Sequence, residues 1–146
     1  MKIPKKEIRL CFIDDEEINR RQLVELAEID FPSAEVTGQE SLARAFRGLK
    51  TYSLMIIDVS ACAGDMLHPE WAYGPIRHFM REYRAPNILV VSGMSLGSVE
   101  FFVEDLKKYV DDKEMADRIH VGGWAGDWKK LSEKIKKLHP AEEFEY

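Results

Sequence analysis

Cysteine is scarce in this chain of 146 residues, and its two copies, Cys11 and Cys62, lie far apart and form no CxxC pair. This usage indicates thiols in a reducing compartment and argues against a disulfide framework or a cysteine-bound metal. No apolar run approaches the ~20 residues that a membrane-spanning helix needs. The start of the chain also lacks the apolar stretch of a signal peptide. We therefore expect a cytoplasmic protein with no membrane partner.

Basic charge is also in short supply, since the formal net charge is −5. A nucleic-acid surface normally needs a basic face, so nucleic acid is not an expected partner. Lysines gather near the end, between Lys129 and Lys137, where they alternate with apolar residues. This alternation favours one solvated helix face over a phosphate-binding patch. The four histidines show no HxxxH or HxH spacing, which favours structural roles over metal binding.

Short apolar runs alternate with amphipathic stretches along the chain. Hydrophobic residues make up 45% of the sequence and charged residues 32%, which is typical of a globular domain. The apolar runs predict strands at 8–13, 34–37, 53–57, 87–91 and 118–121. Helical spacing predicts helices at 18–30, 42–49, 76–83, 99–110 and 128–138. We expect one α/β domain over residues 1–146, with a core at about 8–138 and a polar tail at 139–146. Its parallel sheet should be covered by helices on both faces.

The residues that end the predicted strands carry the chemistry. Asp14 and Asp15 follow the first strand, Asp58 follows the third, and Ser92-Gly93 follows the fourth. In an open parallel sheet, ligand sites lie beyond the carboxyl ends of the strands. Three carboxylates gathered there would repel one another, and a hard cation such as Mg²⁺ would neutralise them. Asp58 could then attack a phosphoryl group while the Ser92 hydroxyl holds one of its oxygens.

A simpler interpretation exists for each residue taken alone. Asp14 and Asp15 could merely begin a helix, where carboxylates favour the positive end of the helix dipole. Asp58 and Ser92 would then be ordinary polar residues at strand ends. The occurrence of all four in this strand order favours a shared site.

These segments resemble the receiver domain of two-component response regulators, over about 8–138. Phe12-Ile13-Asp14-Asp15-Glu16 resembles the acidic pair, Leu54–Asp58 the phosphoacceptor strand, and Val90–Gly93 the strand with the Thr/Ser switch residue. The resemblance implies a doubly wound (βα)5 flavodoxin-like domain with strand order 2-1-3-4-5. It also implies Mg²⁺ bound by Asp14, Asp15, Asp58 and the backbone carbonyl of Ser60. Asp58 would be the phosphoacceptor, and Ser92 and Gly93 would contact the phosphoryl group.

The sequence departs from the family at the predicted fifth strand. A Lys-Pro pair should follow that strand, but Val121-Gly122-Gly123-Trp124 stands there, so the lysine is missing near Gly122. No lysine occurs between Lys113 and Lys129. The aromatic switch position falls on His120 or Ile119. The two glycines could cradle a phosphate, although a tight turn into the last helix is favoured.

The loop after Asp58 also departs from the family. Residues 59–66 lack the usual Met-Pro and Asp-Gly pattern, and the stretch to Trp71 and Tyr73 is longer than usual. Those two aromatic residues could pack into the core, which is favoured, or form a docking patch.

Two functions from different classes follow from these observations. In the first, Asp58 takes a phosphoryl group from a histidine kinase or phosphotransfer protein, with Mg²⁺, and the domain signals by contact with a downstream protein. Such a domain is a self-phosphorylating switch and not a turnover enzyme. In the second, a pseudo-receiver binds proteins constitutively and takes no phosphoryl group. The intact acidic residues and Ser92 favour the first, whereas the missing lysine favours the second. A magnesium-dependent phosphatase is disfavoured, because no second acid stands two residues after Asp58.

Overall fold

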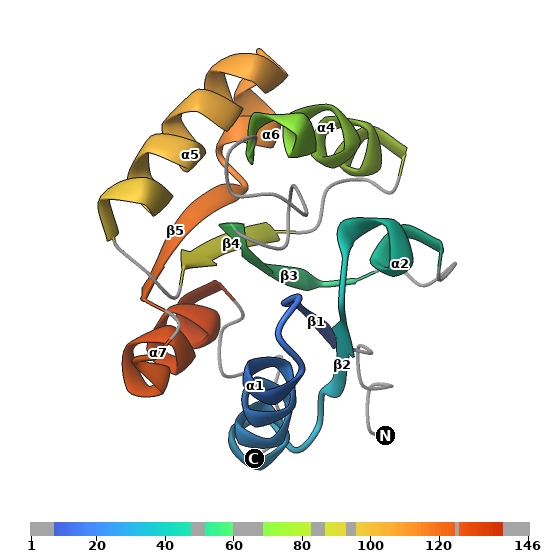
Figure 1. Ribbon diagram of the computed structural model, residues 1–146, viewed down its shortest axis with the longest axis vertical. Helices are drawn as coiled ribbons and strands as arrows, with labels where there is room; N and C mark the ends of the chain where they lie inside the picture. The colour runs from blue at the N-terminus through green and yellow to red at the C-terminus, as the bar shows by residue number, and fades with distance from the viewer. Residues whose placement is uncertain are drawn as a thin grey trace, which may run out of the picture.

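Five strands and their connecting helices alternate along the chain in the computed structural model (Figure 1). The structure describes residues 8–47, 52–59, 69–82, 87–92, 96–124 and 126–138, so the predicted tail at 139–146 lies outside the described residues. The strands are β1 (Arg9–Ile13), β2 (Glu35–Gln39), β3 (Leu54–Asp58), β4 (Asn87–Ser92) and β5 (Ile119–Trp124). The helices are α1 (Glu17–Asp30), α2 (Leu42–Arg47), α4 (Tyr73–Glu82), α5 (Leu96–Val110), α6 (Lys113–Ala116) and α7 (Trp128–Leu138), with a 3₁₀ turn η1 (Pro69–Ala72).

The strands form one parallel sheet in the order β2-β1-β3-β4-β5. This arrangement confirms the predicted doubly wound α/β fold and its strand order. The central strand β3 is buried along its whole length, as its continuous apolar sequence predicts. In the described residues, no helix has the length and apolar character needed to cross a membrane.

Two hydrophobic cores lie on opposite faces of the sheet, because successive strand residues point to opposite sides. Met55 and Ile57 of β3 face the core formed with α2, α4 and α5. Leu54 and Ile56 face the core formed with α1 and α7. Figure 1 shows the same division, with α1 and α7 below the sheet and α4 and α5 above it. Full burial of each such side chain stabilises the fold by about 1.5–3 kcal/mol.

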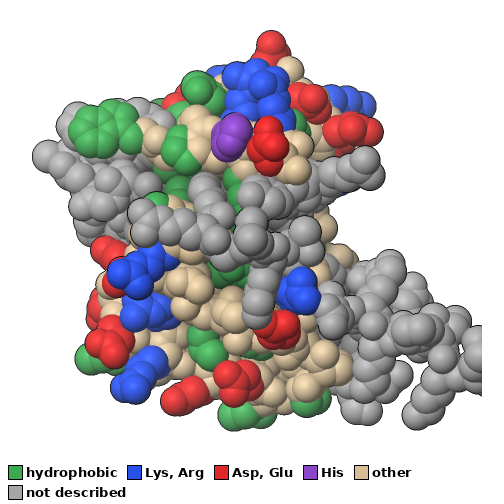
Figure 2. Space-filling view, turned by 90° about the vertical axis from the view of Figure 1, so that its right-hand side faces the viewer, with side chains coloured by type: hydrophobic (Ala, Val, Ile, Leu, Met, Phe, Trp, Pro, Cys, Tyr) green, Lys and Arg blue, Asp and Glu red, His purple; other side chains and the backbone are tan. Residues whose placement is uncertain are grey.

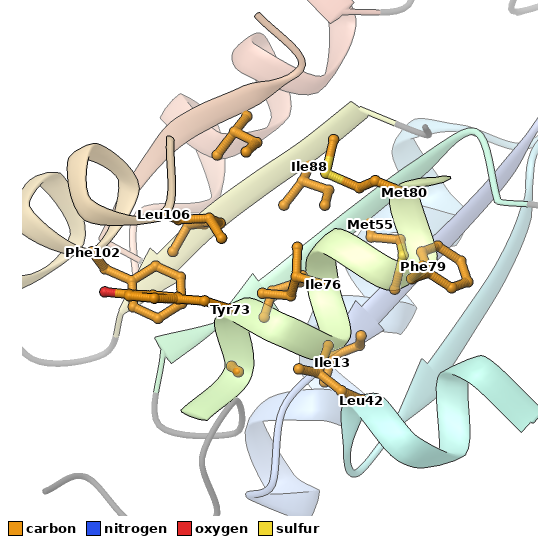
Figure 3. Close-up of a cluster of buried hydrophobic side chains, with 14 of the residues drawn as sticks. Ile13, Leu42, Met55, Tyr73, Ile76, Phe79, Met80, Ile88, Phe102 and Leu106 are labelled. Atoms are coloured by element: carbon orange, nitrogen blue, oxygen red, sulfur yellow. The ribbon is translucent and has the colours of Figure 1, made fainter. Parts of the chain in front are cut away.

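Helix α4 supplies much of the first core (Figure 3). Ile76, Phe79 and Met80 recur at helical spacing and are each at most 2% exposed. Tyr73 begins the helix and lies edge-on to Phe102 of α5, with 5.1 Å between the ring centroids. Trp71, by contrast, is 62% exposed, so the two aromatic residues have different environments. Tyr73 packs into the core, as favoured by the sequence, and Trp71 does not.

The predicted strand bounds are wrong at two glycines. Strand β2 was expected to end before Gly38, yet it continues through Gly38 to Gln39. Strand β5 was expected to end at Val121, yet it continues through Gly122 and Gly123 to Trp124. Neither glycine ends its strand. Gly38 leaves space for the side chain of Arg20, and Gly122 leaves space for Val90 and Val91 of β4.

A short helix between α5 and β5 was also not expected. Asp112 precedes α6, and its Oδ1 accepts a hydrogen bond from the backbone N–H of Met115 at 3.1 Å. An aspartate that caps a helix start is a recognisable signal. The four residues of α6 are too few to show helical periodicity in the sequence.

Candidate functional site at the carboxyl edge of the sheet

Three predicted site residues end adjacent strands of the sheet. Asp14 follows β1, Asp58 ends β3, and Ser92 ends β4, and β3 lies between the other two strands. Because the strands are parallel, all three residues lie at the same edge of the sheet. Their exposed fractions are only 2%, 6% and 6%, respectively. The fold therefore brings two carboxyl groups and a hydroxyl into one buried region.

Asp14 is held by hydrogen bonds to both neighbouring elements. Its backbone N–H donates to the carbonyl of Gln39 in β2 at 3.1 Å. Its Oδ1 accepts from the backbone N–H of Glu16 at 2.9 Å, and its own carbonyl accepts from Arg20 Nη1 at 2.9 Å. Within the described part of the chain, its buried Oδ2 has no hydrogen-bond partner. One oxygen of this carboxyl group is therefore oriented and the other is available for a ligand.

The electrostatics of the site oppose ionisation of Asp14. Burial is the main cause that raises the pKa of Asp14 from its usual 3.8 to about 6. The hydrogen bond from Glu16 N–H lowers this pKa, whereas the negative charges of Asp58, Asp15 and Glu16 raise it further. A cation bound beside Asp14 would offset this repulsion.

Asp15 differs from Asp14 in its environment. Its side chain is exposed, although its charge is close enough to affect the pKa of Asp14. Among the described residues, no group of three or more His, Cys, Asp and Glu side chains is placed so that it could hold a metal ion. Ser60 and Gly93, the other predicted contacts, lie outside the described residues.

Magnesium fits the part of the site that is described. This ion keeps several waters and is commonly bound by only one or two protein carboxylates together with phosphate oxygens. Asp14 and Asp58 provide two buried carboxyl groups, and Asp14 Oδ2 accepts no hydrogen bond from the described residues. The donor set consists of hard oxygen atoms, which suits Mg²⁺ better than a softer transition metal.

The predicted switch positions lie at the other end of β5. Ile119 pairs with Ile88 and His120 with Leu89, whereas Trp124 pairs with Ser92. Ile119 is buried in the core beside α5. His120 is half-buried, and its Nε2 lies 3.2 Å from Asn87 Oδ1. Burial, followed by the charge of Lys107, lowers the pKa of His120.

Gly122 and Gly123 form a bulge inside β5, which corrects the expected turn after the strand. The pairing shifts by one residue between Val90 and Val91, and Gly123 has a φ of 88°. A Cβ atom at Gly122 would lie 2.6 Å from Val91 Cγ1 and 2.8 Å from the Val90 carbonyl oxygen. The position after β5 is therefore residue 125, which lies outside the described residues, and not a residue near Gly122.

Solved structures with a similar fold include several response regulator receiver proteins. A response regulator receiver protein from Pseudomonas putida is 20% identical, with a TM-score of 0.62 over 90% of this chain and 98% of that one. The non-phosphorylated HemR receiver domain from Leptospira biflexa is 13% identical, with a TM-score of 0.63 over 90% and 94%. The phosphorylated cyanobacterial phytochrome response regulator RcpA is 12% identical, with a TM-score of 0.60 over 93% and 94%. This chain has the receiver fold.

Two comparisons of the sequence found nothing. No family model matches the sequence, and no curated protein matches it either. The similarity to these two receiver structures covers 90% of the chain.

Proposed function

We propose that this chain is a phosphoacceptor signalling domain in which Asp58 takes a phosphoryl group in the presence of Mg²⁺. One observation carries the proposal: Asp58 is buried at the end of the central strand, between Asp14 on one side and Ser92 on the other. Asp14 and Asp58 are close enough for their charges to interact. A buried pair of carboxyl groups is costly unless a ligand compensates it.

The reaction moves one phosphoryl group from a nitrogen atom of the donor to a carboxylate oxygen of Asp58. An oxygen of the Asp58 carboxylate forms a bond to phosphorus, and the P–N bond of a phosphohistidine donor breaks. The electron pair of that bond stays on the imidazole nitrogen of the donor. The product is an acyl phosphate on Asp58, and the donor is a histidine kinase or a phosphotransfer protein.

The neighbouring residues have separate roles in this transfer. Bound Mg²⁺ would neutralise charge on the phosphoryl oxygens, and Asp14, Asp58, Asp15 and the Ser60 carbonyl are its proposed ligands. Ser92 ends the adjacent strand, and its hydroxyl is a donor for one phosphoryl oxygen. The modified domain then signals by contact with a downstream protein. Each phosphorylation is a single event, so the domain acts as a switch and not as a turnover enzyme.

Intact-mass measurement after incubation with Mg²⁺ and a small phosphodonor tests this proposal. We expect the mass to increase by one phosphoryl group in the wild type and no increase in Asp58→Asn, because the amide is not a nucleophile for phosphorus. Asp117→Asn is the matched control, since Asp117 is exposed and precedes β5 at the far end of the sheet.

Two results would contradict the proposal. Equal labelling of Asp58→Asn would show that another residue is the acceptor. An unlabelled wild type, with small donors and with phosphohistidine proteins, would favour a pseudo-receiver that binds its partner constitutively.

A further inference from the structure

Arg20 of α1 extends back toward Asp14, which follows β1 and lies before the start of the helix. Its Nη1 donates to the backbone carbonyl of Asp14 at 2.9 Å. The same helix turn is closed by a hydrogen bond from Arg20 N–H to the Glu16 carbonyl at 3.0 Å. One side chain therefore ties the first turn of α1 to the end of β1.

The stem of Arg20 lies over β2 at Gly38. A Cβ atom at Gly38 would lie 2.8 Å from Arg20 Cγ and 3.2 Å from Arg20 Cδ. Real Cβ atoms essentially never come as close as 2.8 Å, and Cγ is near the backbone end of the arginine and cannot swing aside freely. Gly38 pairs with Phe12, two residues before Asp14, so the arginine side chain reaches from β2 to the residue that follows β1. The glycine thus provides the space that Arg20 occupies.

We infer that Arg20 and Gly38 together position Asp14 for the chemistry of the site. This inference rests on the proposed function, because it assigns the two residues to the Mg²⁺ and phosphoryl site. Asp14 is held by Gln39 through its N–H and by Arg20 through its carbonyl, so the backbone is fixed on both sides. With the backbone fixed, the Glu16 N–H holds Oδ1, and no described residue donates a hydrogen bond to the second oxygen. Arg20 is a positioning residue, since it acts through Asp14.

Loss of Arg20 should weaken the site without unfolding the domain. Removing a group that orients a metal ligand typically lowers metal affinity by roughly 10- to 100-fold. We expect Arg20→Ala to raise the Mg²⁺ dissociation constant about tenfold and to speed amide hydrogen exchange at Asp14 and Glu16. Arg20→Lys keeps a cationic donor and should recover part of both losses.

The neighbouring arginine offers a matched control. Arg21 lies on the same helix and is exposed, so Arg21→Ala makes the same change of charge and size away from Asp14. This variant should bind Mg²⁺ as the wild type does.

Gly38→Ala tests the same assignment from the other strand. The added methyl group should displace Arg20 and reproduce the loss seen in Arg20→Ala. In a double-mutant cycle, Gly38→Ala should change Mg²⁺ affinity by less than about twofold once Arg20 is already alanine. Full additivity of the two losses would show that the glycine acts independently of the arginine and would overturn the inference.

Hydrogen exchange separates this inference from the proposed function. Unchanged exchange at Asp14 and Glu16 in Arg20→Ala, or an equal loss of Mg²⁺ affinity in Arg21→Ala, would overturn the positioning role. If the wild type binds no Mg²⁺ and takes no phosphoryl group, the proposed function fails. The exchange of the two amides then still decides whether Arg20 positions Asp14.

Discussion

At the scale of single residues, the adjacent acids Asp14 and Asp15 have different environments. Asp14 is 2% exposed and has a raised pKa, whereas Asp15 is exposed to solvent. A buried carboxylate with like charges nearby weakens the fold unless a cation is bound. This difference makes Asp14 the more informative residue for a test of stability.

Asp14→Asn should stabilise the domain at neutral pH. The pKa of Asp14 is about 6 in the folded chain, above its usual 3.8. Folding therefore favours the protonated carboxyl of Asp14. The stability that this preference adds to the fold is fully present below about pH 4 and is lost as pH rises through about 6. A shift of this size corresponds to about 3 kcal/mol. Asparagine carries no charge, so the variant should be more stable than the wild type by about 1–3 kcal/mol at pH 8 and nearly equal to it at pH 4.

Urea unfolding at pH 4, 6 and 8 checks this prediction. Asp15→Asn is the control, and its stability should follow that of the wild type more closely because Asp15 is exposed. Added Mg²⁺ should stabilise the wild type at pH 8 and have less effect on Asp14→Asn, since only a bound ligand shifts the folding equilibrium. A gain for Asp14→Asn of the same size at pH 4 would exclude the charge of Asp14 as the cause.

At the scale of secondary-structure elements, two strands depend on glycines that fit against a neighbour. Gly38 faces the stem of Arg20, and Gly122 fits against Val90 and Val91 of β4. The bulge at Gly122 and Gly123 lies one pair before Trp124 and Ser92, so it sets the end of β5 beside the site. Bulges often occur next to functional sites, where they redirect the strand.

Gly122→Ala should destabilise the domain by about 1–3 kcal/mol, because the added Cβ overlaps backbone and side chain of β4. Gly74→Ala is the matched control, since a Cβ there would meet only Tyr109 Oη at 3.5 Å. Gly74 lies in α4, where alanine is favoured over glycine by roughly 0.5–1 kcal/mol. Denaturant unfolding of both variants should therefore give changes of opposite sign. A neutral effect of Gly122→Ala would show that β5 can slip past the bulge without cost.

Sequence periodicity predicted these elements well where burial follows a regular pattern. The stripe that begins at Ile76 and the apolar run that ends at Ile57 both occupy the positions expected of them. The prediction from sequence failed at Gly38 and Gly122. A glycine that ends a strand and a glycine that leaves space for a neighbouring side chain look the same in the local sequence. The neighbours that decide between them, Arg20 and Val91, are distant in sequence or belong to another strand.

At the scale of the whole molecule, two layers of helices enclose the sheet and leave its carboxyl edge for the site (Figure 1). The α1 and α7 layer is tied together by Asp30, whose Oδ2 accepts from Trp128 Nε1 at 2.8 Å and Ser132 Oγ at 3.0 Å. On the face shown in Figure 2, the coloured Lys and Arg side chains are interspersed with Asp and Glu. Recognition of a partner on this face would therefore use a mixed pattern of charge.

Phosphorylation should change the surface of residues 95–124 only modestly. In the resembled family, a lysine after the fifth strand links the phosphoryl group to that surface, and this chain has no lysine between Lys113 and Lys129. A charge-assisted hydrogen bond is worth roughly 1.5–3 kcal/mol, which is about one to two decades in an equilibrium constant. Without this bond, phosphorylation should shift the conformational equilibrium of that surface less, by about the same factor. Phosphorylation should change the affinity for a partner only modestly, or should change it through the surface of residues 59–75.

Chemical-shift mapping with and without a phosphoryl mimic measures this effect, and Asp58→Asn shows the shifts that do not depend on the acceptor. Large shifts concentrated on residues 95–124, with little change at 59–75, would show that the chain couples the two regions without the lysine.

The sequence by itself determined the order of strands and helices and the order of the acidic residues along the chain. Both follow from local patterns: apolar periodicity marks the elements, and the polar residues Asp14, Asp58 and Ser92 mark the ends of buried runs. Only the tertiary structure decided that Asp14 is buried while Asp15 is exposed, and that Arg20 and Gly38 hold Asp14 in place. These features depend on how β1, β2 and α1 pack together, and the free energy of that packing arises between segments that are separate in the sequence.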